Sequence, residues 1–312
     1  MSDPFISICI PTYKNVAYLQ RLLESISIQK FRDFEIVVTD NSPDTSVAEL
    51  VNSFEPSLSI RYYKNDPPTN MGENFNRVLQ KGNGKWIKMM HDDDWFASAD
   101  ALQKFAHAAA ATDKKFIFSA CNHIYSPSGK EVDEYLTGWK KEMLEENALN
   151  LFYLNVIGHP SAVMHRKDDS VLYDPGFSWV VDVDFYIRYL NLHPGFEYIP
   201  EMLVKIGVDE NQASNKYYKN PAVEIPEYFT LLAKFPPGLL LQHEYIFHLV
   251  WNLVKRFKIR SAGDVARYGY TGALPDKFEE IIQFQKYIPT LVLKQTPWSK
   301  WLMKRCYQKL KN

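Results

Sequence analysis

The sequence predicts an α/β domain with a mostly parallel sheet and flanking helices, followed by a C-terminal helical region. Over residues 1–121, short β-type runs alternate with helical patterns, which is typical of parallel strands joined by crossover helices. Residues 222–312 show helical apolar spacing without further carboxylate clusters. Apolar residues make up 46% of the 312 residues, enough for a large core. A polar break at 210–221 leads us to predict one domain over residues 1–215 and a helical region over 216–312.

The first elements follow from the spacing of apolar residues. FISICI (5–10) alternates isoleucines with Ser7 and Cys9, so the isoleucines share one face of a strand. Residues 16–28 carry apolar side chains at helical spacing, and Asn15 is the expected N-cap. The same reasoning predicts strands at 35–39, 59–65, 85–90 and 116–121, and helices at 47–54, 74–80 and 100–111.

After residue 121 the alternation becomes less regular. HIYSPSGKEV (123–132) predicts a hairpin that turns at Pro-Ser-Gly. The pattern then predicts a helix at 140–154, a strand at 160–165, a helix at 182–192 and β structure at 196–208.

Composition excludes several classes of protein. The formal net charge of −1 gives no electrostatic reason to expect nucleic-acid binding. No signal-peptide pattern is visible, and no apolar run approaches the roughly 20 residues of a transmembrane helix, so we expect a cytoplasmic protein. Cys9, Cys121 and Cys306 form no CxxC pair, so the sequence predicts neither a disulfide framework nor a zinc–thiolate site.

Three consecutive carboxylates follow the strand expected at 85–90. In HDDDW (91–95), Asp92, Asp93 and Asp94 offer the hard oxygen ligands that Mg²⁺ or Mn²⁺ prefers. A solvated acidic turn that caps the next helix is the alternative. In open α/β sheets, ligands bind beyond the carboxyl ends of the strands. Tyr13 and Asp40 follow the first two expected strands, so we expect them at the same edge as the acidic loop.

Other candidate residues also have two interpretations. Asp40 could accept a hydrogen bond from a nucleobase or form an Asx turn, and Tyr13 could stack on that base or pack as an ordinary aromatic. Asp182 could be a general base at the start of a helix or that helix's N-cap. Arg188 lies four residues after Asp184 and is expected to pair with it, which makes Asp184 the more structural carboxylate.

Five segments, in this order, resemble the inverting glycosyltransferases of the GT-A fold, specifically family 2. They are ISICIPTYKN, FRDFEIVVTDNSPDTS, NMGENFNRVLQKGNGKWIKMMHDDDWF, IGHPSAVMHRK and WVVDVDFYIRYL, and they span about the first 215 positions. The resemblance implies a transferase of the hexosyltransferase type. It implies a nucleotide-sugar donor, with a UDP-sugar favoured, and Mn²⁺ or Mg²⁺ as cofactor. The implied acceptor is a glycan or lipid-linked oligosaccharide of bacterial surface polysaccharide synthesis.

The resemblance also implies roles for individual residues. Asp182 would take the proton of the acceptor hydroxyl, and Asp93 would hold the metal, helped by Asp94 and Asp209. Asp92 would contact the ribose. The donor-binding set implied in this way is Pro11, Thr12, Tyr13, Asp40, Asn70, Asp92 and Asp94.

Three positions depart from the family pattern. His91 stands where an acidic residue is common, which leaves the main metal ligand open between Asp93 and Asp94. Val181 replaces the glutamate that usually precedes the base. Asp209 occupies a position that is often histidine, and it could close over the metal or the diphosphate or be an ordinary loop carboxylate.

The last residues, 295–312, combine two tryptophans with lysines and arginine. This composition suits a helix at an anionic membrane surface, peripheral to the inner face of the plasma membrane. Packing on its own domain is the alternative, and the C-terminal helices could equally form a homodimer face. Two other functions remain open: a nucleotidyltransferase, for which PTYKN is a poor phosphate loop, and a catalytically silent nucleotide-sugar or glycan-binding protein.

Overall fold

The computed structural model describes residues 3–55, 57–210, 213–236 and 238–311. The chain forms two compact units. The first comprises Met1–Glu146, Val156–Gly176 and Asp184–Gln212, and the second comprises Asn147–Asn155, Phe177–Val183 and Ala213–Asn312. Two short segments from the middle of the chain thus belong with the C-terminal helices, which no local pattern indicated. The division at residue 215 stays a prediction, and residues 211–212 of the expected polar break lie outside the described residues.

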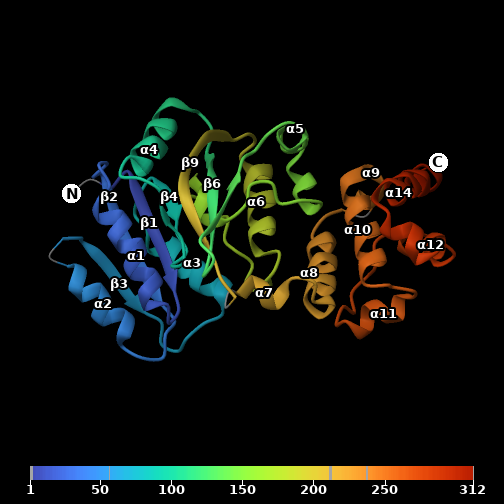
Figure 1. Cartoon of the computed structure of the whole chain (residues 1–312), viewed down its shortest axis with the longest axis horizontal. Helices are drawn as coiled ribbons and strands as arrows, with labels where there is room; N and C mark the ends of the chain where they lie inside the picture. Colours follow the sequence, from blue (N-terminus) through green and yellow to red (C-terminus); the bar gives the residue numbers. More distant parts are fainter. Residues whose placement is uncertain (1–2, 56, 211–212, 237, 312) are drawn as a thin grey trace. The chain divides into compact units, whose positions relative to one another are not determined.

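The first unit is built on one curved sheet (Figure 1). Its order is β3-β2-β1-β4-β8-β6-β9-β5, with β7 paired to β6. The strands are β1 (Ile6–Thr12), β2 (Phe34–Asp40), β3 (Ile60–Lys64), β4 (Trp86–Met89), β5 (Trp95–Phe96), β6 (Phe116–Tyr125), β7 (Lys130–Glu134), β8 (Val163–Arg166) and β9 (Glu197–Val208). Strands β3, β2, β1 and β4 pair in parallel, as expected.

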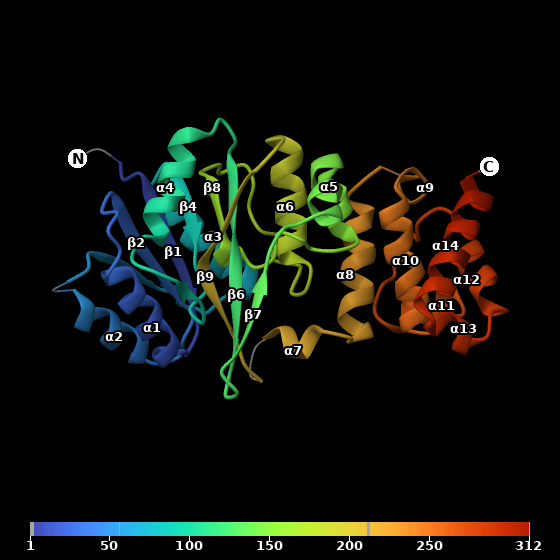
Figure 2. The ribbon, with the colours of Figure 1, turned by 45° about the horizontal axis from the view of Figure 1, so that its top comes forward.

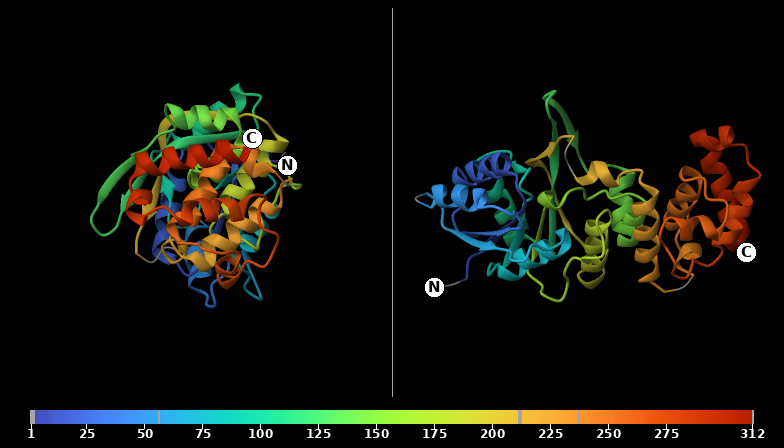
Figure 3. Two further views of the ribbon diagram at one scale, coloured as in Figure 1. Left: turned by 90° about the vertical axis from the view of Figure 1, so that its right-hand side faces the viewer. Right: turned by 90° about the horizontal axis from the view of Figure 1, so that it is seen from below.

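Beyond β4 the sheet is mixed. Strand β8 runs antiparallel to both β4 and β6, while β6 and β9 are parallel. The expected hairpin is present: β7 returns antiparallel to β6 and extends as a two-stranded ribbon (Figures 2 and 3). The two-residue strand β5, which follows the acidic loop and pairs with β9, was not predicted because a run this short carries no periodicity.

Helices cover both faces of this sheet. They are α1 (Val16–Ser27), α2 (Ser46–Phe54), α3 (Met71–Lys81), α4 (Ala101–Ala111), α5 (Trp139–Glu146) and α6 (Val181–Leu192). The first three residues of α6 belong to the second unit, and the first unit resumes at Asp184. Ile6, Ile8 and Ile10 lie in one core cluster with buried residues of α1, α2 and α4. Cys9 points to the opposite face, where its thiol contacts the carbonyl of Val78 in α3. The predicted alternation in β1 is therefore confirmed.

The second unit is helical. It contains the 3-10 helix η1 (Ala148–Phe152) and α7 (Ala213–Tyr217), α8 (Pro221–Ala233), α9 (Leu239–Gln242), α10 (Glu244–Arg256), α11 (Ala262–Arg267), α12 (Phe278–Lys286), α13 (Thr290–Lys294) and α14 (Thr296–Lys311). Trp251 of α10 is fully buried and donates to Ser299 Oγ of α14 at 3.1 Å. The predicted helical C-terminal region is confirmed. Among the helices of the described residues, none has the length and apolarity needed to span a bilayer.

Two predicted elements are divided. The helix expected at 140–154 ends at Glu146, because the Asn147 side chain accepts from Leu149 N at 2.9 Å and starts η1 instead. The strand expected at 160–165 begins with the 3-10 turn η2 (Pro160–Ala162), and only Val163–Arg166 pairs as β8.

Candidate active site

The acidic loop lies where the strand order of the sheet reverses. Strand β1 has β2 on one side and β4 on the other, and all three are parallel, so their carboxyl ends share one edge. Thr12 and Asp40 are partners in register at this edge, and the acidic loop directly follows β4. Ligands of open α/β sheets bind at such a point. The predicted gathering of Tyr13, Asp40 and the aspartates at one edge is therefore observed.

Asp92 ties the loop after β1 to the loop after β4. Its carboxylate accepts from Thr12 Oγ1 at 2.6 Å, from Tyr13 N at 3.3 Å and from Asn15 Nδ2 at 3.3 Å. Burial, and then the charge of Asp93, raises the pKa of Asp92 to about 7 against the effect of these bonds. Asn15 occupies the N-cap position of α1 but makes no side-chain capping bond; its Nδ2 donates to Asp92. A ribose contact by Asp92 stays a prediction.

His91, Asp93 and Asp94 form a compact group of possible metal ligands, with one atom from each lying within 4.8 Å of the others. His91 Nε2 and Asp94 Oδ2 are buried without a hydrogen-bond partner among the residues that the structure describes. Burial and the neighbouring Asp93 raise the pKa of Asp94 well above its usual value. Buried polar atoms without partners are rare in folded proteins. An imidazole nitrogen and two carboxylate oxygens this close together therefore fit a divalent cation.

Arg21 of α1 holds the acidic loop from the side. Its Nη2 donates to the Asp93 carbonyl at 2.7 Å, and its guanidinium lies 3.6 Å from the centre of the Trp95 ring. This residue was not predicted, since one arginine at the border of a helix's apolar face carries no distinguishing signal. Tyr18 of the same helix donates from its Oη to Asp209. Asp209 is not one of the three clustered ligands, so its predicted role in closing over the metal stays a prediction.

Lys88 is a second cation that sequence reasoning missed. It is fully buried in β4 and donates to the carbonyls of Ser161 and, at 3.3 Å, Val163. Burial lowers its pKa to about 7. Ser161 Oγ in turn accepts from His91 N at 2.8 Å. The segment before β8 is thereby fastened to the acidic loop.

The other residues implied for donor binding have varied surroundings. Asp40 is fully buried and accepts from Ser42 N, Tyr62 Oη and Lys64 Nζ at 2.7 to 2.9 Å, so the Asx-type interpretation is realised. A nucleobase contact by Asp40 stays a prediction. Tyr13 is 54% exposed, as a stacking ring would need to be.

The three other residues implied for donor binding, Pro11, Thr12 and Asn70, make contacts that support the fold. Pro11 and Thr12 are buried at the end of β1. Asn70 caps α3 by accepting from Glu73 N at 2.9 Å. Their roles toward a donor also stay predictions.

Asp182, in the second unit, is the second residue of α6 and not its N-cap. Its Oδ1 is buried with no hydrogen-bond partner within the described part of the chain, and burial raises its pKa to about 7. The amides of Ser178, Trp179 and Val180 instead donate to Glu227 of α8 at 2.7 to 3.0 Å. Glu227 thus satisfies the backbone amides that lead into the helix. A general-base role for Asp182 stays a prediction.

The pairing expected for Asp184 is confirmed within the first unit. Its Oδ2 accepts from Arg188 Nε at 3.0 Å, and the carboxylate is fully buried. The two aspartates of VDVD therefore differ: Asp184 forms an ion pair with Arg188, whereas Asp182 Oδ1 is buried without a hydrogen-bond partner among the described residues.

Gly207 in β9 is required by the acidic loop. A Cβ there would overlap the Asp93 carbonyl oxygen and lie 3.2 Å from Arg21 Nη2. We expect Gly207→Ala to lower the free energy of unfolding by about 2 kcal/mol and to weaken Mn²⁺ binding, because the loop must shift. Gly263→Ala, where the nearest atom is at 3.5 Å, is the control and should be neutral or slightly stabilising. Calorimetric unfolding with and without Mn²⁺ measures both effects; equal behaviour of the two variants would contradict the packing argument.

Known proteins share this architecture. The family Glycosyl transferase family 2 matches residues 7–172. The protein MT1568 of Mycobacterium tuberculosis strain CDC 1551 is 29% identical over 223 residues. The match covers 65% of this chain and 66% of MT1568, so this chain spans just under two thirds of that protein's length. The abequosyltransferase RfbV of Salmonella typhimurium is 26% identical over 312 residues, which cover 94% of this chain and 81% of RfbV.

Solved structures agree in fold. A crystal structure of residues 1–349 of S. aureus TarS in complex with UDP-GlcNAc superposes with a TM-score of 0.58 at 16% identity, covering 98% of this chain and 90% of that one. The mannosyltransferase PcManGT of Pyrobaculum calidifontis, in complex with GDP-Man and Mn²⁺, superposes with a TM-score of 0.58 at 14% identity. The superposition covers 98% of this chain and 85% of PcManGT. The expected GT-A fold is confirmed. Since the family match spans more than half of the sequence, this chain belongs to glycosyl transferase family 2, the family of enzymes that the resemblance predicted.

Proposed function

We propose that this protein transfers a sugar from a nucleoside-diphosphate sugar to a hydroxyl group of a glycan or lipid-linked acceptor, with inversion at the anomeric carbon and dependence on a divalent metal. The observation that carries the proposal is the cluster of His91, Asp93 and Asp94 at the point where the strand order reverses. Two of its three residues carry a buried atom without a hydrogen-bond partner in the described chain: Nε2 of His91 and Oδ2 of Asp94. An acidic turn that served only as a cap would face water instead.

The residues present fit a divalent cation. Asp93 and Asp94 would supply carboxylate oxygens and His91 an imidazole nitrogen, a set that Mn²⁺ accepts more readily than Mg²⁺ because of the nitrogen. When bound, the cation would neutralise the diphosphate of the donor and make it a better leaving group. The structural neighbour PcManGT, whose structure contains Mn²⁺ and GDP-Man, supports metal use in this fold.

For the donor, a UDP-sugar is the first choice. TarS, with the same fold, is in complex with UDP-GlcNAc. Tyr13, more than half exposed at the same edge as the acidic loop, offers a ring on which a uracil can stack. Asp92 keeps that loop in place through Thr12 and the Tyr13 amide, whichever nucleotide binds.

Asp182 is the proposed general base. In the transfer step the acceptor oxygen forms a bond to the anomeric carbon from the face opposite the nucleotide. The bond from that carbon to the diphosphate breaks, and the hydroxyl proton passes to the Asp182 carboxylate. A base works best when its pKa lies near the working pH, and burial raises the pKa of Asp182 to about 7.

The direct experiment measures release of UDP from UDP-sugars in the presence of Mn²⁺, with and without glycan and lipid-linked acceptors, and reads the anomeric configuration of the product by NMR. Release of UDP with a product of inverted configuration is expected. Tight donor binding with no release under any condition would support the alternative of a silent binding protein, and a product of retained configuration would contradict the proposed mechanism.

The surface of α13 and α14 supports contact with a lipid-linked acceptor at a membrane. Leu291, Trp298 and Trp301 are exposed by 73%, 56% and 48%, and the Arg305 guanidinium lies 5.0 Å from the centre of the Trp301 ring. The opposite face of α14, with Ser299, Met303, Cys306 and Tyr307, is buried in the second unit. The expected packing and the expected exposed basic aromatic face are thus both present on one helix.

We expect the double variant Trp298→Ser/Trp301→Ser to lose most of its binding to vesicles with anionic lipid, while neutral vesicles bind neither protein. Trp139→Ser, which removes a tryptophan of 51% exposure in α5, is the matched control and should bind as the unmodified protein does. Flotation with vesicles measures this. Undiminished binding of the double variant would contradict the membrane role, and a change from dimer to monomer in sedimentation would assign this face to a second copy of the chain instead.

A further inference from the structure

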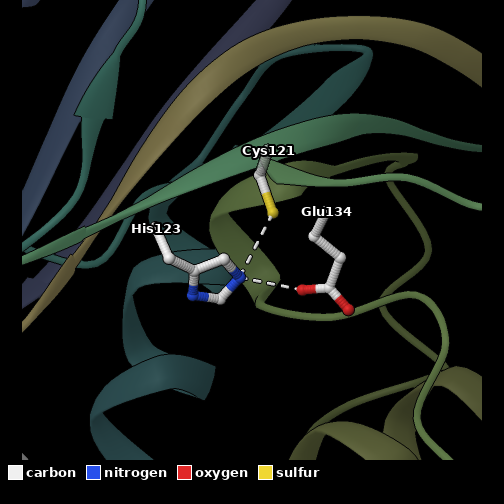
Figure 4. Close-up of side chains that lie close together, drawn as sticks. All are labelled: Cys121, His123 and Glu134. Atoms are coloured by element: carbon white, nitrogen blue, oxygen red, sulfur yellow. Dashed lines mark hydrogen bonds and ion pairs between the residues drawn. The ribbon is translucent and has the colours of Figure 1, made fainter. Parts of the chain in front are cut away.

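A second group of possible metal ligands lies on the β6–β7 hairpin. Cys121 and His123 are two residues apart in β6, so their side chains share one face of the strand. In the antiparallel pair, Glu134 of β7 is the register partner of Cys121. The sheet register therefore brings the thiol, the imidazole and the carboxylate together without any contribution from a loop (Figure 4).

The spacing of the three side chains is close to that of a coordination site. Cys121 Sγ lies 3.8 Å from His123 Nε2, which lies 2.8 Å from Glu134 Oε2, and all three ligand atoms lie within 4.8 Å of one another. Around a tetrahedral zinc ion, a sulfur and a nitrogen would be about 3.6 Å apart, and a nitrogen and an oxygen about 3.3 Å apart. Small rotations of these side chains would therefore be enough to admit an ion.

The ligand types select the metal. A thiolate beside an imidazole suits zinc and its neighbours in the transition series, whereas Mg²⁺ and Mn²⁺ favour groups in which oxygen ligands predominate. The group around Asp93 offers two oxygens and no sulfur, so the two groups differ in the cations that they favour. The sequence did not predict this group, because it contains no CxxC pair. One cysteine, one histidine and a glutamate from the next strand come together only through the register of the hairpin.

We propose that Cys121, His123 and Glu134 form a binding site for a zinc-class dication, separate from the donor metal site. Three protein ligands leave a fourth position for water. The ion would fasten β7, whose residues are mostly exposed, to the buried strand β6. This proposal does not depend on the proposed function, because none of its ligands belongs to the His91–Asp93–Asp94 group.

The test uses the full-length, metal-free protein and Co²⁺ as the probe. Cobalt bound to a thiolate gives a sulfur-to-metal charge-transfer absorption that oxygen and nitrogen ligands alone do not give. We expect this absorption in the unmodified protein, its displacement by Zn²⁺, and its loss in Cys121→Ser. Asp93→Asn should keep it, because Asp93 is not one of the three ligands of this group.

The matched control is a histidine–carboxylate pair without a cysteine. His193 Nε2 lies 2.6 Å from Asp168 Oδ2, so His193→Ala removes a comparable pair and should leave the cobalt absorption unchanged. Should Cys121→Ser fail to fold, Glu134→Gln gives the second measurement, with an expected loss of at least about tenfold in Co²⁺ affinity. Absence of the absorption in the unmodified protein, its persistence in Cys121→Ser, or an unchanged affinity in Glu134→Gln would each overturn the proposal. Mn²⁺-dependent UDP release by Cys121→Ser is measured in parallel, so failure here remains distinct from failure of the transferase.

Discussion

Replacing Asp182 by asparagine should lower kcat about 10²- to 10⁴-fold, the usual contribution of a general base, while the affinity for a UDP-sugar stays nearly unchanged. Asparagine keeps the size of the side chain but cannot take the proton of the acceptor hydroxyl. The unmodified enzyme should lose activity as the pH falls through about 7, because burial raises the pKa of Asp182 to about 7 and only the ionised carboxylate is a base. The variant should lack this dependence. Initial rates over about pH 5.5 to 8.5 measure both effects.

The free energy of unfolding should depend on pH in the opposite direction to activity: the ionisation of Asp182 that activates the enzyme also lowers its stability. Burial disfavours the ionised carboxylate, so Asp182 costs the folded protein stability as the pH rises from its ordinary pKa toward 7. Asp182→Asn should therefore be at least as stable as the unmodified protein above about pH 7. Asp184→Asn is the control: it breaks the buried pair with Arg188 and should lower stability. An Asp182→Asn variant with full activity at saturating acceptor would remove this residue from the mechanism.

Replacing Asp93 by asparagine should weaken Mn²⁺ binding about 100-fold or more and reduce UDP release to a similar extent. The metal-free variant should be no less stable than the unmodified protein, because the charge of Asp93 raises the pKa values of both Asp92 and Asp94 by repulsion. A merely structural carboxylate would show the reverse, with lost stability and unchanged metal dependence. Isothermal titration with Mn²⁺ and calorimetric unfolding without metal distinguish the two.

The control for this variant is Asp113→Asn, which removes a carboxylate that is 87% exposed after α4. Its Mn²⁺ affinity and turnover should equal those of the unmodified protein. If Asp93→Asn behaved like this control, the cluster with His91 and Asp94 would not be the site of the metal.

The sequence allowed prediction of those parts of the site that depend on local order along the chain. Apolar spacing located the strand ends, and the rule for parallel sheets then brought Tyr13, Asp40 and the acidic loop to one edge. The sequence also predicted the Asp184–Arg188 pair, because side chains four residues apart on a helix lie next to each other. In each case the relevant contact is either within one element or follows from the shared direction of parallel strands.

The residues that were missed act across long sequence separations. Glu227 accepts a hydrogen bond from the amide of Val180, 47 residues away in the sequence. Arg21 donates to the carbonyl of Asp93, 72 residues away. A buried amide network is similar: Asn65 Nδ2 donates to Asn41 Oδ1 at 2.8 Å and Asn74 Oδ1 at 2.7 Å, linking segments that follow β2 and β3 to α3. A polar residue that supports a distant loop has the same local pattern as one that faces water, so only the fold separates them.

Binding of nucleoside diphosphates tests the central claim most directly. Titration calorimetry with UDP, GDP, CDP and dTDP, each with Mn²⁺ and with a chelator, should show tight binding of one nucleotide, with UDP favoured, that disappears with the chelator and in Asp93→Asn. Such a result would establish a metal-dependent donor site at the His91–Asp93–Asp94 cluster and identify the donor class. Failure of all four nucleotides to bind in the presence of Mn²⁺ would contradict the account, because the edge of the sheet would then hold an acidic turn without a donor.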